Sequence, residues 1–133
     1  MEGKDMFIEN ESAYGFEETV EKFEQAVKSE SWGMIHTYDL QEILEGKGFE
    51  VEATKVFSIC KPPYANKLLS NDDLKIFSSL MPCRVSVTQK ENGKTYVSRM
   101  NFEALASTIG GDVGDIMGDA YKEVERMLTS VVR

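Results

Sequence analysis

The stretch 83-CRVSVTQKENGKTYVSRM-100 decides the fold of this chain, because it holds two runs in which apolar and polar residues alternate. Alternation with a period of two is typical of a strand with one buried face. Asn92 and Gly93 stand between the runs, and both residue types tolerate a positive φ, which favours a type I′ turn. The sequence therefore predicts a β-hairpin over residues 83–100.

The chain before this hairpin predicts three more strands, two helices and a connection. Apolar residues recur at three- and four-residue steps from Phe16 to Val27, which indicates an amphipathic helix. Asp39 is expected to cap a second, shorter helix. We predict strands in 4-KDMFIENESA-13, Met34–Tyr38 and 52-EATKVFSIC-60, helices in 16-FEETVEKFEQAVKSE-30 and 39-DLQEILEGKG-48, and a helical, loop-rich connection over 64–81.

The chain after the hairpin predicts two helices. A short one is capped by Asn101, a glycine-rich break follows at 109–115, and an apolar face from Val113 to Val131 marks a long terminal helix. The expected fold is an α+β sandwich: an antiparallel β-sheet with helices packed on one face. With 133 residues, the chain fits a single domain over residues 1–133.

Charge and composition exclude several classes of partner. The formal net charge is −8, so the electrostatic field of the protein would repel phosphate backbones, and we expect no nucleic acid among its partners. No run approaches the roughly 18 apolar residues that a membrane helix needs, so we expect no membrane partner. The first residues lack a cationic segment followed by an apolar one, and we predict a cytoplasmic protein.

Two cysteines form the candidate site. Cys60 ends one predicted strand and Cys83 begins another, so the two sulfurs lie at one edge of the sheet if these strands are antiparallel neighbours. Lys61 and Arg84 follow them directly, and nearby cations lower a thiol pKa. Cys60, Lys61, Cys83 and Arg84 are therefore the candidate ligand-binding residues, with Cys60 and Cys83 as candidate metal ligands.

A different interpretation of the same residues remains open. Free cysteine is among the most buried residue types, so both cysteines can serve in core packing alone. His36 is the only histidine and would be the general base of a thiol site, although a single histidine in a strand is more often structural. The sequence assigns no catalytic residue and no cofactor.

The motifs 59-ICKPPYANKLL-69 and 80-LMPCRVSV-87 resemble those of the family called domain of unknown function 302. Its pattern is cysteine-asparagine-proline with a following alanine, then leucine-proline-cysteine-asparagine-valine. The resemblance extends over about residues 6 to 132. It implies a β-α-β-β-β-β-α sandwich similar to the TATA-binding-protein fold, and a homodimer. Both cysteines belong to the pattern, but Lys61 and Arg84 replace its asparagines. If the asparagines bind a ligand, these replacements suit a different or more anionic one; if they only cap turns, the replacements are neutral.

Three functions follow from these observations. The first is a small protein of unassigned function that binds a small ligand, a sulfur species or a soft metal at the two cysteines. The second is a thiol-dependent enzyme that holds a small anionic substrate with Lys61 or Arg84. The third is a dimeric interaction module with structural cysteines. Binding is favoured over catalysis.

Overall fold

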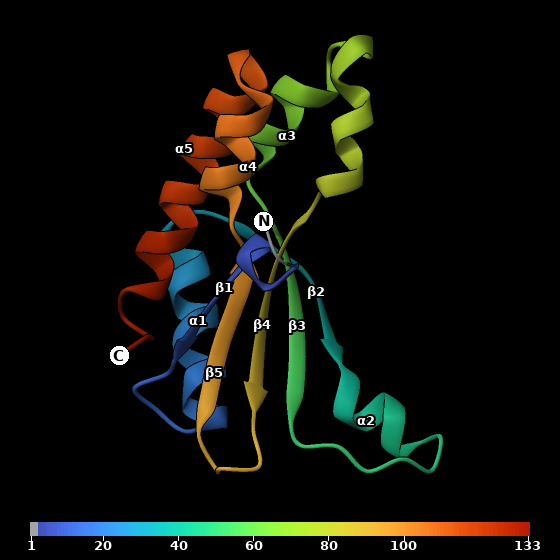
Figure 1. Cartoon of the computed structure of the whole chain (residues 1–133), viewed down its shortest axis with the longest axis vertical. Helices are drawn as coiled ribbons and strands as arrows, with labels where there is room; N and C mark the ends of the chain where they lie inside the picture. The colour runs from blue at the N-terminus through green and yellow to red at the C-terminus, as the bar shows by residue number, and fades with distance from the viewer. Residues whose placement is uncertain (1–2) are drawn as a thin grey trace.

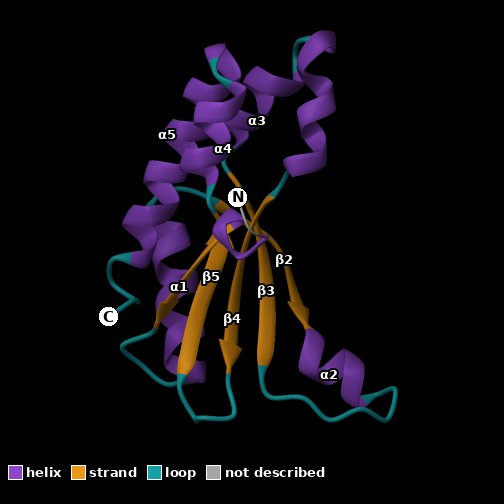
Figure 2. Ribbon diagram, viewed as in Figure 1, coloured by secondary structure: helices purple, strands orange, loops and turns teal. Residues whose placement is uncertain are grey.

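The computed structural model describes residues 3–133 and has a five-stranded antiparallel sheet with helices on one side, as predicted (Figures 1 and 2). The strand order is β1-β5-β4-β3-β2, so β1 and β2 are the edges. The strands are β1 (Phe7–Glu11), β2 (Gly33–Asp39), β3 (Thr54–Cys60), β4 (Cys83–Gln89) and β5 (Thr95–Met100). The predicted single domain begins with residues 1–2, which lie outside the described part.

The helices follow the predicted order, and the two predicted caps are confirmed. The Asp39 side chain accepts a hydrogen bond from the backbone N–H of Glu42 at 3.0 Å, and Asn101 does the same for Ala104 at 3.2 Å. The helices are α1 (Phe16–Ser29), α2 (Leu40–Glu45), α3 (Pro62–Leu69), α4 (Phe102–Ile109) and α5 (Gly111–Leu128), with 3₁₀ helices η1 (Gly3–Met6) and η2 (Asp72–Leu80).

The main core lies between the sheet and two helices, α1 and the C-terminal half of α5 (Figure 1). Alternate residues of the central strands point toward these helices, as the period of two requires. Phe57 on β3 and Phe23 on α1 are both fully buried, and their ring centroids are 5.2 Å apart. The remaining members are Val20, Val27, Trp32, Ile59, Val85, Val87, Val97, Val124, Met127, Leu128 and Val131.

A second apolar cluster lies beyond one end of the sheet, where α3, η2, α4 and the first half of α5 form a helical cap (Figure 2). Its buried members are Leu68, Ala106, Val113 and Met117. The sequence predicted only a helical connection over 64–81, because the apolar residues of this segment fit neither one helix face nor one strand face. Their burial depends on α4 and α5, which follow much later in the chain.

The hairpin is confirmed, but the type I′ turn is wrong. The N–H of Gly93 donates to the Lys90 carbonyl at 2.9 Å, and the N–H of Lys90 donates to the Lys94 carbonyl at 3.0 Å, which defines a three-residue loop over 91–93. Gly93 has a φ of 82°, whereas Asn92 is not among the described residues with positive φ. The loop therefore needs one left-handed residue, whereas a type I′ turn needs two. The Asn92 side chain also accepts a hydrogen bond from the Lys94 N–H at 2.9 Å.

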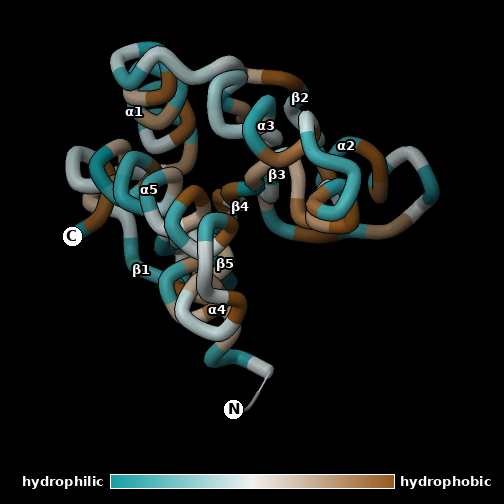
Figure 3. Tube along the Cα trace, turned by 90° about the horizontal axis from the view of Figure 1, so that it is seen from above, coloured by the Kyte–Doolittle hydropathy of each residue, from teal (hydrophilic) through white to brown (hydrophobic). Residues whose placement is uncertain are grey.

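The other face of the sheet is not covered by these helices. Seen from above, α1 and α5 lie to one side of the strands (Figure 3). The uncovered face carries the strand residues that alternate with the core-facing ones. Among them are His36, Tyr38 and Arg84, which are all exposed. Within residues 3–133, no helix has the length and apolar character needed to cross a membrane.

Candidate functional site

The two cysteines meet at one end of the sheet, as the sequence predicted. Cys60 is the last residue of β3 and Cys83 the first of β4, and the two strands pair antiparallel with Ile59 opposite Cys83. Both cysteines are free and only partly buried. The pairing of β3 with β4 therefore places both thiols at the boundary between the main core and the helical cap.

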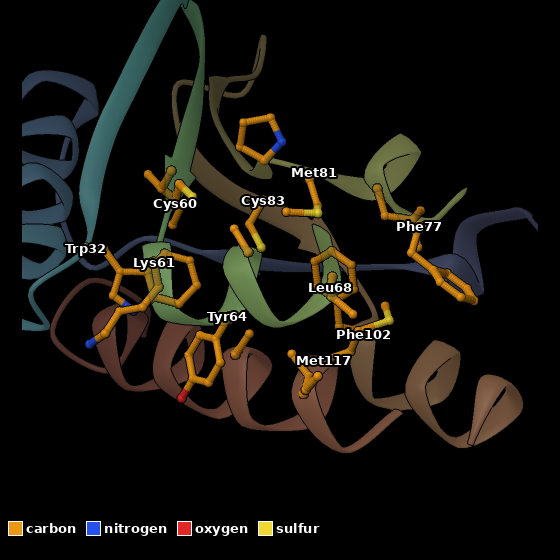
Figure 4. A pocket seen from close by; sticks show the side chains of 16 residues that line it. Trp32, Cys60, Lys61, Tyr64, Leu68, Phe77, Met81, Cys83, Phe102 and Met117 are labelled. Carbon is orange, nitrogen blue, oxygen red and sulfur yellow. The ribbon is translucent and has the colours of Figure 1, made fainter. Parts of the chain in front are cut away.

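Both thiols line a small pocket at this boundary (Figure 4). The pocket encloses about 60 Å³ and is almost entirely apolar. In Figure 4, Cys60, Cys83 and Met81 follow one another along one side, across from Tyr64 and Met117. The rest of the lining is aromatic or aliphatic apart from Lys61: Trp32, Ile59, Lys61, Ala65, Leu68, Phe77, Leu80, Pro82, Phe102, Ile116 and Ala120.

The pocket raises the pKa of both thiols, contrary to the effect predicted for Lys61 and Arg84. Burial raises the pKa of Cys83 to about 11, with a smaller contribution from the nearby Cys60 sulfur. Burial also raises the pKa of Cys60. Both groups are therefore neutral thiols at pH 7, and neither is an activated nucleophile.

Lys61 does not activate the thiols because its ammonium is held by other groups. Its Nζ donates to Glu123 Oε1 at 3.0 Å and to the backbone carbonyl of Glu30 at 2.8 Å. Glu123 also accepts from Trp32 Nε1 at 3.0 Å and, at its other oxygen, from the Tyr64 hydroxyl. A lysine, a tyrosine and a tryptophan thus converge on one nearly buried carboxylate beside the pocket.

The pKa values of this cluster follow from its hydrogen bonds. Burial raises the pKa of Glu123, but the hydrogen bonds from Tyr64, Trp32 and Lys61 together outweigh it, so the net pKa lies below the ordinary value. The same bond, with burial, raises the pKa of Tyr64 to about 12. Glu123 therefore stays ionised and Tyr64 neutral over the physiological range.

Glu123 was not among the residues predicted from the sequence, although one feature pointed to it. The residue lies three positions after Ala120 and four before Met127, within the apolar stripe of the terminal helix. A carboxylate in such a stripe needs a buried partner. Its partners are Tyr64 of α3, Lys61 just before α3 and Trp32 just before β2, so the spacing along the terminal helix could not predict them.

The structure does not bring the remaining candidates to the pocket. Arg84 is adjacent to Cys83 and therefore points to the opposite face of the sheet, where its guanidinium lies 5.9 Å from the Tyr38 ring centroid. His36 is exposed on the edge strand β2 and packs edge-on against Tyr38, with 4.4 Å between ring centroids. Neither side chain lines the thiol pocket.

The Tyr64–Glu123 hydrogen bond predicts a loss of stability at high pH. Because the pKa of Tyr64 is raised from 10 to about 12, its stabilising contribution is complete below pH 10 and is lost as the pH rises through 12. Urea unfolding from pH 8 to 12 should show a steeper loss for the wild type than for Tyr64→Phe. The control is Tyr96→Phe, which removes an exposed hydroxyl; an equal change in both variants would contradict the assignment.

Comparisons with known proteins agree with this fold and with the family that the sequence resembles. The chain is similar to a crystal structure of an uncharacterized conserved protein DUF302 from Bacillus stearothermophilus, with a TM-score of 0.82, 22% identity, and coverage of 94% of this chain and 97% of that one. No curated protein matched the sequence. The model of the family described as domain of unknown function DUF302 matches residues 8–132. The chain therefore belongs to the DUF302 family, as its two cysteine motifs predicted.

Proposed function

We propose that this protein binds a soft monovalent metal ion, of which Cu(I) is the test case, at Cys60 and Cys83. The observation that carries this proposal is that four sulfur side chains, Cys60, Cys83, Met81 and Met117, line one apolar pocket. Thiolates and thioethers are the ligands that Cu(I) prefers, whereas carboxylates suit harder ions. The described residues contain no cluster of three or more His, Cys, Asp or Glu side chains, so a zinc-type site has less support.

The size of the pocket supports a very small ligand. Its volume of about 60 Å³ is well below the ~150 Å³ of an engineered apolar cavity that holds benzene. A single ion, or a sulfur species of a few atoms, fits this volume. We rank the metal first because the thioethers of Met81 and Met117 have a role in metal binding and none in carrying a sulfur atom.

Metal binding must displace the thiol protons. Both cysteines are neutral at pH 7, so a Cu(I) ion bound by two thiolates releases two protons to the solvent, with no change in oxidation state. Binding should therefore tighten as the pH rises. The positive ion offsets part of the cost of placing two thiolates in an apolar pocket.

The test is an anaerobic titration of the purified protein with Cu(I) in the presence of a competing chelator, with proton release measured in weak buffer. We expect one ion per chain and two protons per ion. Cys60→Ala and Cys83→Ala should each weaken binding at least about tenfold, and Met81→Leu should weaken it less. Met6→Leu, outside the pocket, is the matched control; equal binding by wild type and both cysteine variants would overturn the proposal.

The thiol-dependent enzyme has less support from the geometry. A thiol enzyme needs a thiol of lowered pKa or a base within hydrogen-bond reach, but burial raises both thiol pKa values and His36 lies outside the pocket. An anionic substrate would find Lys61 already paired with Glu123.

Homodimer formation is the second part of the proposal. Large apolar side chains are exposed along β2, α2 and the loop that follows: Ile35, Ile43 and Phe49, at 58%, 51% and 62%. Exposed apolar residues of this kind are common at protein interfaces. Sedimentation equilibrium should give twice the 15.0 kDa chain mass, and Phe49→Ser should shift the equilibrium toward monomer. A monomer at all concentrations would exclude this part and leave the metal proposal intact.

A further inference from the structure

A second hollow lies on the uncovered face of the sheet and adjoins the thiol pocket next to the helical cap. Its volume is about 340 Å³, within the range of roughly 300–1,000 Å³ typical of small-molecule sites. Open-face residues of β4 and β5 form its polar part, Arg84, Ser86 and Ser98. Phe7, Val56 and Met100 form an apolar part.

Arg84 is the cation available to a ligand in this hollow. The other arginine of the lining, Arg99, is buried and donates to both carboxylate oxygens of Glu125, at 2.9 and 2.6 Å, and to Asn10. The ion pairs of the described residues include none for Arg84, whose recorded contact is the Tyr38 ring. The other three arginines, Arg99, Arg126 and Arg133, each pair with a glutamate.

A buried polar atom lies beside this arginine. Ser58 is opposite Arg84 in the pairing of β3 with β4, and it is 2% exposed. Its hydroxyl oxygen has no hydrogen-bond partner in the structure. An unpaired buried hydroxyl costs free energy, but Ser58 does not line the hollow, so this oxygen is not a contact for a ligand there.

We propose that this hollow binds a small carboxylate with an apolar tail. The guanidinium of Arg84 suits a carboxylate because its fork donates two parallel N–H···O bonds. The hydroxyls of Ser86 and Ser98 lie on the same face, and the tail packs on Phe7, Val56 and Met100. Glu9, opposite Ser98 in the sheet, is already paired with Lys90 at 2.8 Å, which reduces its repulsion of an anion.

This site is separate from the proposed metal site, although the two hollows share a wall. Leu80, Met81, Pro82 and Phe102 line both of them. A variant in that wall would therefore affect both sites. Arg84 lines only the second hollow and Cys60 only the first, so variants at these two residues distinguish failure of one proposal from failure of the other.

The test is an NMR titration of the ¹⁵N-labelled protein with hexanoate, with hexanamide as the neutral probe of the same shape. We expect saturable shifts at the amides of Ser86 and Ser98 with hexanoate, and much weaker binding of hexanamide. Arg84→Gln should weaken hexanoate binding about tenfold or more, because it removes a charge-assisted bond, and Arg84→Lys should restore part of the loss.

The matched control is Lys47→Gln, which changes the net charge equally at an exposed position after α2. It should bind hexanoate as the wild type does. Circular dichroism of Arg84→Gln checks that the fold is kept. Equal binding of hexanoate by Arg84→Gln and Lys47→Gln would overturn the proposal. Equal binding of hexanoate and hexanamide by the wild type, or chemical shifts that never saturate, would also overturn it.

Discussion

Replacing Phe57 with alanine should lower the free energy of unfolding by about 3–5 kcal/mol, the range found for large-to-small changes at buried aromatic residues. Phe57 is fully buried at the centre of β3, and its ring packs against Phe23 of α1 at 5.2 Å between centroids. The change removes both the buried apolar area and the contact that holds α1 on the sheet. Urea denaturation followed by circular dichroism measures the loss.

Ile76→Ala is the control for this prediction. A large apolar side chain is again removed, but Ile76 is 74% exposed on η2, so the free energy of unfolding should change by no more than about 0.5 kcal/mol. A small effect at both positions would mean that the β3–α1 contact does not hold the main core together. Ile76→Ala is also expected to leave the midpoint of thermal unfolding nearly unchanged.

Replacing Glu123 with alanine should lower the free energy of unfolding by about 3 kcal/mol, because breaking a largely buried ion pair leaves its partner uncompensated. The Lys61 ammonium loses its carboxylate, and the Trp32 and Tyr64 donors lose their acceptor. These bonds join α3 to α5 next to the thiol pocket. We therefore expect faster labelling of Cys83 by a thiol reagent in the variant, because the pocket opens more often.

The pH dependence gives this prediction a second readout. The pKa of Glu123 is lowered, so its stabilising contribution is present above the ordinary value of 4.5 and is lost as the pH falls below it. The alanine variant should therefore lose less stability than the wild type between pH 7 and pH 3. Glu21→Ala removes an exposed carboxylate from α1 and serves as control; if both variants keep the wild-type acid dependence, the cluster contributes nothing.

The sequence predicted the sheet and its main helices because their patterns are local. The alternation over residues 83–100 and the helical spacing from Phe16 each involve neighbours a few positions apart, which the backbone geometry converts directly into a face. The turn type was wrong because Asn-Gly is compatible with more than one loop length. The choice of a three-residue loop depends on the pairing of Lys90 with Lys94.

The candidate site was predicted in part, and the part that was predicted wrongly has a simple geometric cause. Proximity of Cys60 and Cys83 followed from the order of the strands, which the sequence contained. The predicted effect of Arg84 on the thiol pKa was wrong. Consecutive residues of a strand point to opposite faces, so the guanidinium lies across the sheet from the neighbouring thiol. Lys61 was assigned to a ligand but pairs with Glu123, 62 residues further along the chain.

The sequence by itself determined the α+β class, the strand and helix order, the family and the meeting of the two cysteines. Only the tertiary structure decided the chemistry around them. The thiol pKa values, the pairing of Lys61, the four-sulfur pocket and the separate hollow at Arg84 all depend on which distant side chains share a buried space. Burial and pairing are sums over neighbours in three dimensions, so residue spacing along one chain does not specify them.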